Sequence, residues 1–270
     1  MRGEAERARL DAARIKALAL IKSGDDAEAE INQLLQEFSG HSGLAVVIHS
    51  LASEYERQGK YEKARNLHQQ IIQQWPENAR ADRARFDFSK TTVLSLIHSG
   101  EYAAAEAKLA KFTADFGGHS LFTRAMVPIG EQYYIQGCVK EGQGDSSHAE
   151  QLYEKAITVL SLVTGQSQSY EFTPVAWYLT GRCYRGLGNY EKGIECCEKV
   201  TADWPDHRYA GESQFLVGRS YEKLAKAGAM SRSEAKPKIK AAYQRLVENY
   251  PDCEAARYAQ RWLGRHGTEF

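Results

Sequence analysis

Three histidines recur at matching places along the chain, and histidine is a residue type often used for acid–base chemistry and for binding metals. Residues 38–41 (FSGH), 116–119 (FGGH) and 204–207 (WPDH) each run from an aromatic residue to a histidine. Because these histidines occupy one place in separate repeats, at least two of them should lie too far apart to share a ligand. The spacing therefore predicts structural or capping roles for His41, His119 and His207.

The other residues with reactive side chains show no catalytic or metal-binding spacing. The five cysteines are Cys138, Cys183, Cys196, Cys197 and Cys253. An odd number without a C-x-x-C pair argues against a zinc site and a disulfide framework, and favours small core residues over a reactive thiol. The sequence contains no H-E-x-x-H, G-x-S-x-G, Walker-type or G-x-G-x-x-G motif. We therefore expect no enzyme, no metal and no cofactor.

Composition excludes further classes of protein. The 35 basic and 35 acidic residues give a net charge of zero, so no overall field favours nucleic acid or an anionic membrane. No stretch approaches the roughly 20 apolar residues of a membrane span. Near the N-terminus the longest apolar run, residues 17–21, is too short for the core of a signal peptide.

Glycines recur at near-regular intervals and predict the elements that position these residues. Gly24, Gly59, Gly100, Gly144 and Gly188 are separated by 35, 41, 44 and 44 residues. Each is expected to end one helix in the left-handed conformation that glycine adopts most easily. Five residues later stands a small residue that would let a second helix pack closely: Ala29, Ala64, Ala105, Ala149 and Gly193.

Two stretches carry a fuller pattern. One runs Trp177, Gly181, Tyr184, Gly188, Tyr190, Pro205, and the other runs Ile48, Leu51, Ala52, Tyr55, Gly59, Tyr61, Ala64, Ile71, Pro76. This is the spacing of a tetratricopeptide helix–turn–helix, and the whole chain resembles that family. The resemblance implies an all-α fold, a right-handed superhelical solenoid of antiparallel helix pairs. It would have about six repeats plus a terminal helix, in a single domain over residues 1–270.

The later repeats are similar to those of bacterial cell-envelope proteins. Residues 203–221 (DWPDHRYAGESQFLVGRSY) and 249–264 (NYPDCEAARYAQRWLG) resemble repeats of the Tol–Pal-associated periplasmic protein and of the outer-membrane β-barrel assembly lipoprotein. The sequence supports neither assignment, because it has no lipoprotein cysteine near the N-terminus and no coiled-coil heptads. Two segments depart from the repeat length. Residues 161–174 are expected to form a loop, and residues 225–238 an exposed, mobile turn before a helix that resumes at Ile239.

The resemblance also implies a binding groove lined by the first helix of each repeat, and it places a set of residues there. His49, Tyr134, Tyr178 and Phe215 share one repeat position, Arg182 and Arg219 share another, and Arg185 and Lys223 follow one turn later. Residues four apart lie on one helix face, so Tyr178 should stand beside Arg182, and Phe215 beside Arg219. The eight residues are predicted to bind peptide, and the two arginines to grip an acidic or carboxylate-ended segment. Alternatively, the aromatic residues fill gaps between adjacent first helices, and the arginines form salt bridges across repeats to Glu141, Glu212 or Glu222.

The sequence favours a non-catalytic scaffold of bacterial origin that binds a peptide or partner protein. The alternative is a ligand- or peptide-sensing regulatory module of a larger signalling protein. Partners are expected to be protein, with no nucleic acid and no membrane span. If a signal peptide has been removed, the periplasm or cell envelope is favoured; otherwise the protein is cytoplasmic.

Overall fold

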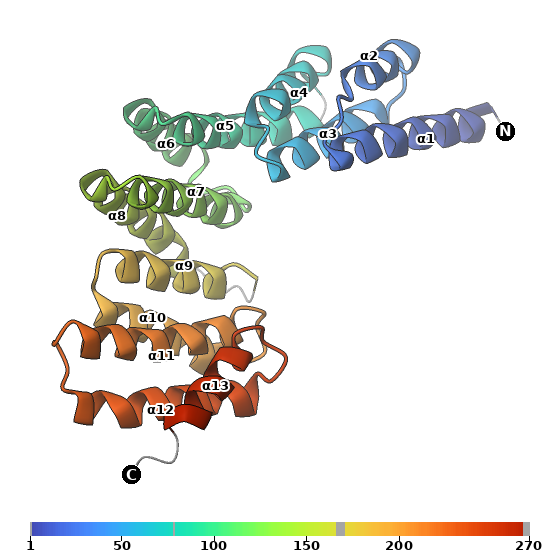
Figure 1. The fold of residues 1–270 in the computed structure, drawn as a ribbon. Coiled ribbons are helices and arrows are strands. Elements are labelled where there is room, and N and C mark those ends of the chain that lie inside the picture. The colour runs from blue at the N-terminus through green and yellow to red at the C-terminus, as the bar shows by residue number, and fades with distance from the viewer. Residues whose placement is uncertain (1, 78, 166–170, 267–270) are drawn as a thin grey trace. The chain divides into compact units, whose positions relative to one another are not determined.

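The protein is an all-α helical repeat structure, seen here in a computed structural model that describes residues 2–77, 79–165 and 171–266. These residues form thirteen helices and no strand, which confirms the predicted fold class (Figure 1). The helices fall into two compact units, residues 1–119 and 120–270, and each unit is described by itself. The single domain over residues 1–270 stays a prediction.

The first unit contains three antiparallel helix pairs (Figure 1). Its helices are α1 (Arg2–Ser23), α2 (Glu28–Glu37), α3 (Leu44–Arg57), α4 (Tyr61–Gln74), α5 (Ala79–Ser99) and α6 (Tyr102–Phe116). The first helices of successive pairs contact one another, α1 with α3 and α3 with α5. Those three helices therefore form one continuous layer.

The second unit contains three more pairs and a last single helix. Its helices are α7 (Phe122–Gly142), α8 (Ser146–Thr164), α9 (Thr173–Gly186), α10 (Tyr190–Asp203), α11 (Ala210–Lys226), α12 (Arg232–Asn249) and α13 (Ala256–His266). The helix α7 packs against α9, and α13 packs on α12 at the C-terminal end of the described chain. Six pairs and one terminal helix match the number of repeats expected from the sequence.

The turn glycines adopt the predicted conformation. All five have a positive φ, between 72° at Gly59 and 90° at Gly24, and so does Gly228, with φ 74°. Gly228 turns the sixth pair, inside the segment that was expected to be a long mobile loop. A side chain would be strained at each of these positions.

The small residues of the second helices lie in the core with one exception. Ala64, Ala105, Ala149 and Gly193 are buried, whereas Ala29 is exposed. The prediction for Ala29 was wrong because α2 begins at Glu28, four residues after its turn glycine, while the next four second helices begin two residues after theirs. The change of register buries Ala27 in the core instead.

Two predictions about loops need correction. The segment from Arg232 onward is not a mobile turn but the start of α12. The Ser231 hydroxyl accepts a hydrogen bond from the Glu234 backbone N–H, and the Glu234 side chain accepts one from the Ser231 N–H. This capping box begins a helix before Ile239. In the earlier segment, residues 161–164 belong to α8 and residues 173–174 to α9; residues 166–170 lie outside the described residues.

We expect Gly181→Leu to lower the free energy of unfolding by about 1–3 kcal/mol, because it overpacks the contact between α9 and α10. A Cβ atom at Gly181 would stand 2.9 Å from the Cys197 Sγ and 3.3 Å from the Gly193 carbonyl oxygen. The control is Gly264→Ala, since Gly264 has open space around it. Chemical denaturation of both variants checks the register, and equal stabilities would contradict it.

Candidate functional site

The second unit brings three of the predicted binding residues together. The Arg182 guanidinium lies over two aromatic rings, 4.7 Å from the centre of Tyr134 on α7 and 5.6 Å from that of Tyr178 on α9. Its Nη1 also donates a hydrogen bond of 3.3 Å to the Tyr178 hydroxyl. The expected pairing of Tyr178 with Arg182 is confirmed, and the nearer ring comes from the preceding repeat. A guanidinium held against two rings is attracted by their faces and fixed in orientation.

The third repeat of this unit contributes a tyrosine and a carboxylate. The Tyr209 ring stacks on Tyr178 with the ring centres 4.5 Å apart and the planes 9° apart. The Tyr178 hydroxyl donates a hydrogen bond of 2.6 Å to the Glu212 carboxylate on α11. These contacts hold Tyr178 between two repeats, which agrees with the alternative that the aromatic residues fill gaps between helices. The same contacts present Tyr134, Arg182 and Tyr209 at one surface.

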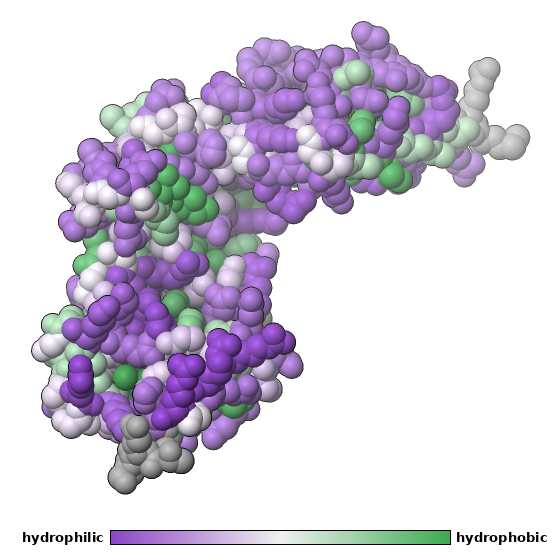
Figure 2. All heavy atoms as spheres, viewed as in Figure 1, coloured by the Kyte–Doolittle hydropathy of each residue, from purple (hydrophilic) through white to green (hydrophobic). Residues whose placement is uncertain are grey.

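A pocket of about 600 Å³ lies at this surface. Its walls come from α7, α9 and α11 and from the corner before α11; they are formed by Glu131, Tyr134, Ile135, Cys138, Val139, Tyr178, Leu179, Arg182, Tyr209 and Glu212. Ile135 and Val139 are 42% and 44% exposed, and Figure 2 shows an apolar patch on the surface over α7. Exposed apolar residues beside fixed aromatic and charged groups are typical of an interaction surface.

The phenols of Tyr134 and Tyr178 stay neutral at physiological pH. Burial raises the pKa of Tyr178, and its hydrogen bond to Glu212 raises it further. Burial also raises the pKa of Tyr134, against the opposing charge of Arg182. These two tyrosines therefore bring no charge to the pocket.

Phe215, Arg219 and Lys223 on α11 do not extend this surface in the expected way. The Arg219 guanidinium bonds to Glu222 at 2.5 Å and to the Tyr258 hydroxyl at 2.7 Å, and it lies over the Tyr258 ring. Phe215 meets the edge of the same ring, 5.5 Å between centres, so the two residues share Tyr258 as a neighbour. Arg219 thus pairs with Glu222, one of the carboxylates named in the alternative, but it does so within α11 and not across repeats. Lys223 is exposed.

Arg185 links two first helices from within the protein. Its Nη1 donates a hydrogen bond of 3.0 Å to the Leu216 carbonyl oxygen and another to the Ser220 hydroxyl. Ser220 is fully buried. These contacts join α9 to α11 and leave Arg185 a positioning role beside the pocket.

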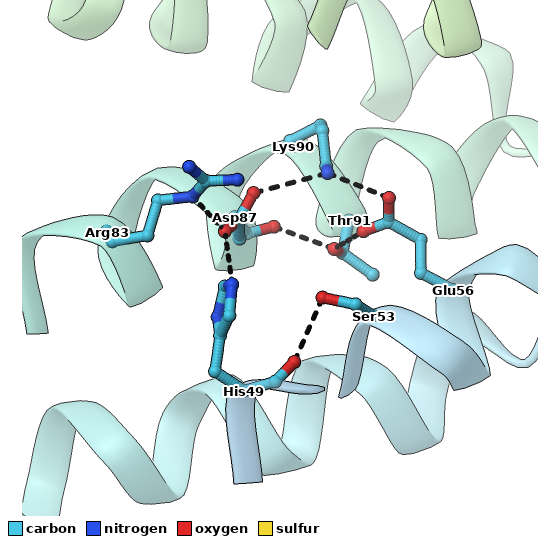
Figure 3. Close-up of polar contacts among 7 residues, drawn as sticks. All are labelled: His49, Ser53, Glu56, Arg83, Asp87, Lys90 and Thr91. Carbon is cyan, nitrogen blue, oxygen red and sulfur yellow. Dashed lines mark hydrogen bonds and ion pairs between the residues drawn. The ribbon is translucent and has the colours of Figure 1, made fainter. Parts of the chain in front are cut away.

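His49 lies in the first unit, in a layer of polar side chains between α3 and α5 (Figure 3). Its Nε2 is 3.8 Å from the Asp87 carboxylate, which also meets Arg83 at 2.5 Å and Lys90 at 3.2 Å. Lys90 in turn meets Glu56 at 2.7 Å. Burial opposes the ionisation of Asp87, but Lys90 and Arg83 outweigh it and hold its pKa below the ordinary value.

A second histidine lies beneath this layer, and the sequence analysis missed it. His68 on α4 is 1% exposed, and its ring centre is 5.5 Å from that of His49. Burial lowers the pKa of His68 to about 4, although Asp87 opposes the shift. Burial also lowers the pKa of His49. Both rings are therefore neutral at pH 7, and the layer has the character of a structural core.

The repeated corner histidines have the structural roles predicted for them. The Nδ1 of His41 accepts a hydrogen bond of 3.0 Å from the Gly43 N–H, and that of His207 accepts one of 3.3 Å from the Tyr209 N–H. His119 stacks on Phe86 with ring centres 4.6 Å apart. Asn78, which holds the equivalent place in another repeat, lies outside the described residues.

The described residues also limit other kinds of site. Within them, no group of three or more histidine, cysteine, aspartate or glutamate residues is placed to hold a metal ion. In the same residues, none of the helices has the length of apolar sequence that crossing a membrane requires.

Sequence comparison assigns the repeats. Two segments match models of the tetratricopeptide repeat, residues 47–80 and residues 174–202; the first lies over α3 and α4 and the second over α9 and α10. The chain therefore carries tetratricopeptide repeats, one matched in each unit. Proteins built from these repeats are generally non-catalytic and mediate protein–protein interactions. The cell-envelope subtype is not among the matches. Among curated proteins, none matches the sequence.

Several solved structures are similar to the chain at low identity. BtubC (BKLC) from P. vanneervenii is 15% identical with a TM-score of 0.49, over 90% of this chain and 91% of that one. A putative kinesin light chain with TPR-like repeats, from Podosopora anserina, is 16% identical with a TM-score of 0.46, over 78% and 99%. PilF of Pseudomonas aeruginosa is 15% identical with a TM-score of 0.42, over 94% and 97%.

Proposed function

We propose that this protein is a non-catalytic scaffold that binds a segment of a partner protein in the groove lined by first helices. The observation that carries the proposal is the pocket of about 600 Å³ in the second unit, with exposed Ile135 and Val139 at its wall. Rigid aromatic and arginine side chains are the usual anchors of protein interfaces. Here Tyr134, Tyr178 and Arg182 are fixed by one another before any ligand arrives, so little conformational entropy is lost on binding.

The remaining predicted residues have supporting places in this proposal. Phe215, Arg219 and Lys223 would border the groove on α11, and Arg185 holds α11 against α9. His49 would form part of a separate stretch of groove in the first unit. A cell-envelope location is proposed only from the likeness of the sequence around residues 203–221.

Selection of displayed random peptides on the whole protein tests the site. We expect the selected peptides to bind wild type and to lose affinity at least tenfold for Ile135→Ser with Val139→Ser, which removes apolar contact area at exposed positions. The control is Ile15→Ser, a change at a 62% exposed position in the other unit. Peptides that bind the double variant as well as wild type, or a selection that recovers none, would contradict the proposed site.

A further inference from the structure

The pocket in the second unit has an excess of carboxylates. Its charged walls are Glu131 on α7, Glu212 on α11 and Arg182 on α9, two negative groups against one positive group. Arg182 was expected to act with Arg219, but Arg219 is held by Glu222 and Tyr258. An acidic ligand would therefore approach two carboxylates, and the two nearby guanidiniums already lie over tyrosine rings, Arg182 over Tyr134 and Arg208 over Tyr209. Like charges brought together at an interface are unfavourable.

The two carboxylates differ in how well they are compensated. Glu212 accepts a hydrogen bond from the Tyr178 hydroxyl. Among the described residues, no hydrogen bond or ion pair is made by Glu131, and only the more distant charges of Arg208 and Arg182 act on it. Burial in the pocket raises the pKa of Glu131, and Arg208 and Arg182 only partly oppose this shift, although the residue as a whole remains exposed. A cation placed beside Glu131 would relieve that cost.

The aromatic residues around these carboxylates already accommodate cations. Arg182 lies over Tyr134 and Tyr178, and Arg208, outside the pocket walls, lies over Tyr209 with 4.8 Å to the ring centre. Ring faces attract cations and repel anions. Ile135 and Val139 offer an apolar surface at the same wall. The carboxylates and ring faces of this pocket thus suit a basic ligand group, and the surface of Ile135 and Val139 suits an apolar one.

We propose that the pocket formed by Glu131, Glu212, Tyr134, Tyr209, Ile135 and Val139 binds a partner segment in which a lysine or arginine adjoins an apolar side chain. This inference rests on the proposed peptide-binding function and specifies the chemistry of its ligand. The cation lies between Glu131 and Glu212, and the apolar side chain lies on α7. Arg182 fixes the tyrosine rings and does not bind the ligand's charge.

Three labelled peptides of equal length test the inference, with leucine alternating with lysine, with glutamate or with glutamine. Fluorescence anisotropy should show that the lysine peptide binds most tightly and that its affinity falls as salt rises. The double variant Glu131→Gln with Glu212→Gln should bind the lysine peptide roughly tenfold or more weakly than wild type does. Arg182→Met should raise the affinity for the lysine peptide relative to the glutamate peptide, because it removes a positive charge from the pocket walls.

A matched control separates the pocket from the overall charge. Glu195→Gln with Glu198→Gln removes two exposed carboxylates from α10 and should leave the affinity unchanged. Circular dichroism verifies that each variant is folded. If the control variant loses as much affinity for the lysine peptide as the pocket variant does, the attraction is nonspecific and the inference is overturned.

The other outcomes distinguish a failure of this inference from a failure of the proposed peptide-binding function on which it rests. If the glutamate peptide binds most tightly and Arg182→Met abolishes that binding, the ligand is not basic and the inference is overturned, but the pocket is still the binding site. Equal binding of all three peptides, reduced by Ile135→Ser with Val139→Ser, would also overturn the inference, since only apolar contacts would matter. Binding of none, or binding indifferent to every pocket variant, would overturn the proposed function as well.

Discussion

Replacing Asp87 with alanine is expected to lower the free energy of unfolding of the first unit by about 3–5 kcal/mol. The Asp87 side chain is only 4% exposed and meets Arg83, Lys90 and His49 (Figure 3). Removing one member of a buried charged group leaves the others without compensation in a poorly solvated place. Lys90 would keep Glu56, 2.7 Å away, whereas the Arg83 Nε would lose its carboxylate partner.

A surface aspartate on the same helix provides the control for Asp87. Asp82 is 83% exposed and lies 2.6 Å from Arg85, and such exposed pairs contribute about 0–1 kcal/mol. Denaturant unfolding measures the stabilities, and hydrogen exchange of amides in α3 and α5 reports on the first unit separately. Equal losses in Asp87→Ala and Asp82→Ala would show that the polar layer does not stabilise the interface between α3 and α5.

The parts of the fold that the sequence predicted are those with a local physical cause. A glycine with positive φ is favoured by its own backbone, so Gly59 and Gly188 could be identified without knowing what packs around them. The corner histidines are similar, because His41 and His207 bond to an N–H group two residues away. Pairing of Tyr178 with Arg182 followed from helical spacing alone.

The errors arose where the outcome depends on context or where a local signal was overlooked. Ala29 follows its turn glycine at the usual spacing, but the late start of α2 exposes it. Arg219 meets Tyr258, which comes from α13, 39 residues further along the chain, and nothing near Arg219 indicates that partner. By contrast, the start of α12 was predictable, since Ser231 and Glu234 have the spacing of a capping box.

The candidate site was only partly predictable for the same reason. Tyr134 and Tyr178 share one repeat position and Arg182 occupies another, and the family pattern assigns both positions to the groove, so all three were found. Glu131 was missed although it lies three residues before Tyr134 on α7, at a repeat position that also lines the groove in this family. Tyr209 was missed because it belongs to the corner before α11, where the repeat pattern gives it a structural role. Asp87 and His68 lie within amphipathic helices, where a polar residue is expected to face solvent; only the packing of α3, α4 and α5 buries them.

Lowering the pH from 7 to 4.5 is expected to destabilise the first unit by about 2–3 kcal/mol through His68. Its pKa is about 4 in the folded protein and about 6.5 when unfolded. Between these values the unfolded chain binds a proton that the folded chain does not, so stability falls as pH falls through this window. The lowered pKa of His49 acts in the same direction. Asp87 has a folded pKa below 3.8, so its contribution is lost only at still lower pH.

The variant His68→Leu removes the titrating group and fills its buried place with an apolar side chain of similar size. Its free energy of unfolding should change much less between pH 7 and pH 4.5 than that of wild type. The groups that face His68 are His49 on α3 and Asp87, Lys90 and Arg83 on α5, and all of them remain in the variant. His148→Gln, at an exposed histidine of the second unit, should keep the wild-type dependence on pH. Hydrogen exchange of amides in α4 at both pH values reports on the first unit separately. If the stability of His68→Leu falls between pH 7 and pH 4.5 as steeply as that of wild type, this histidine does not govern the acid sensitivity of the first unit.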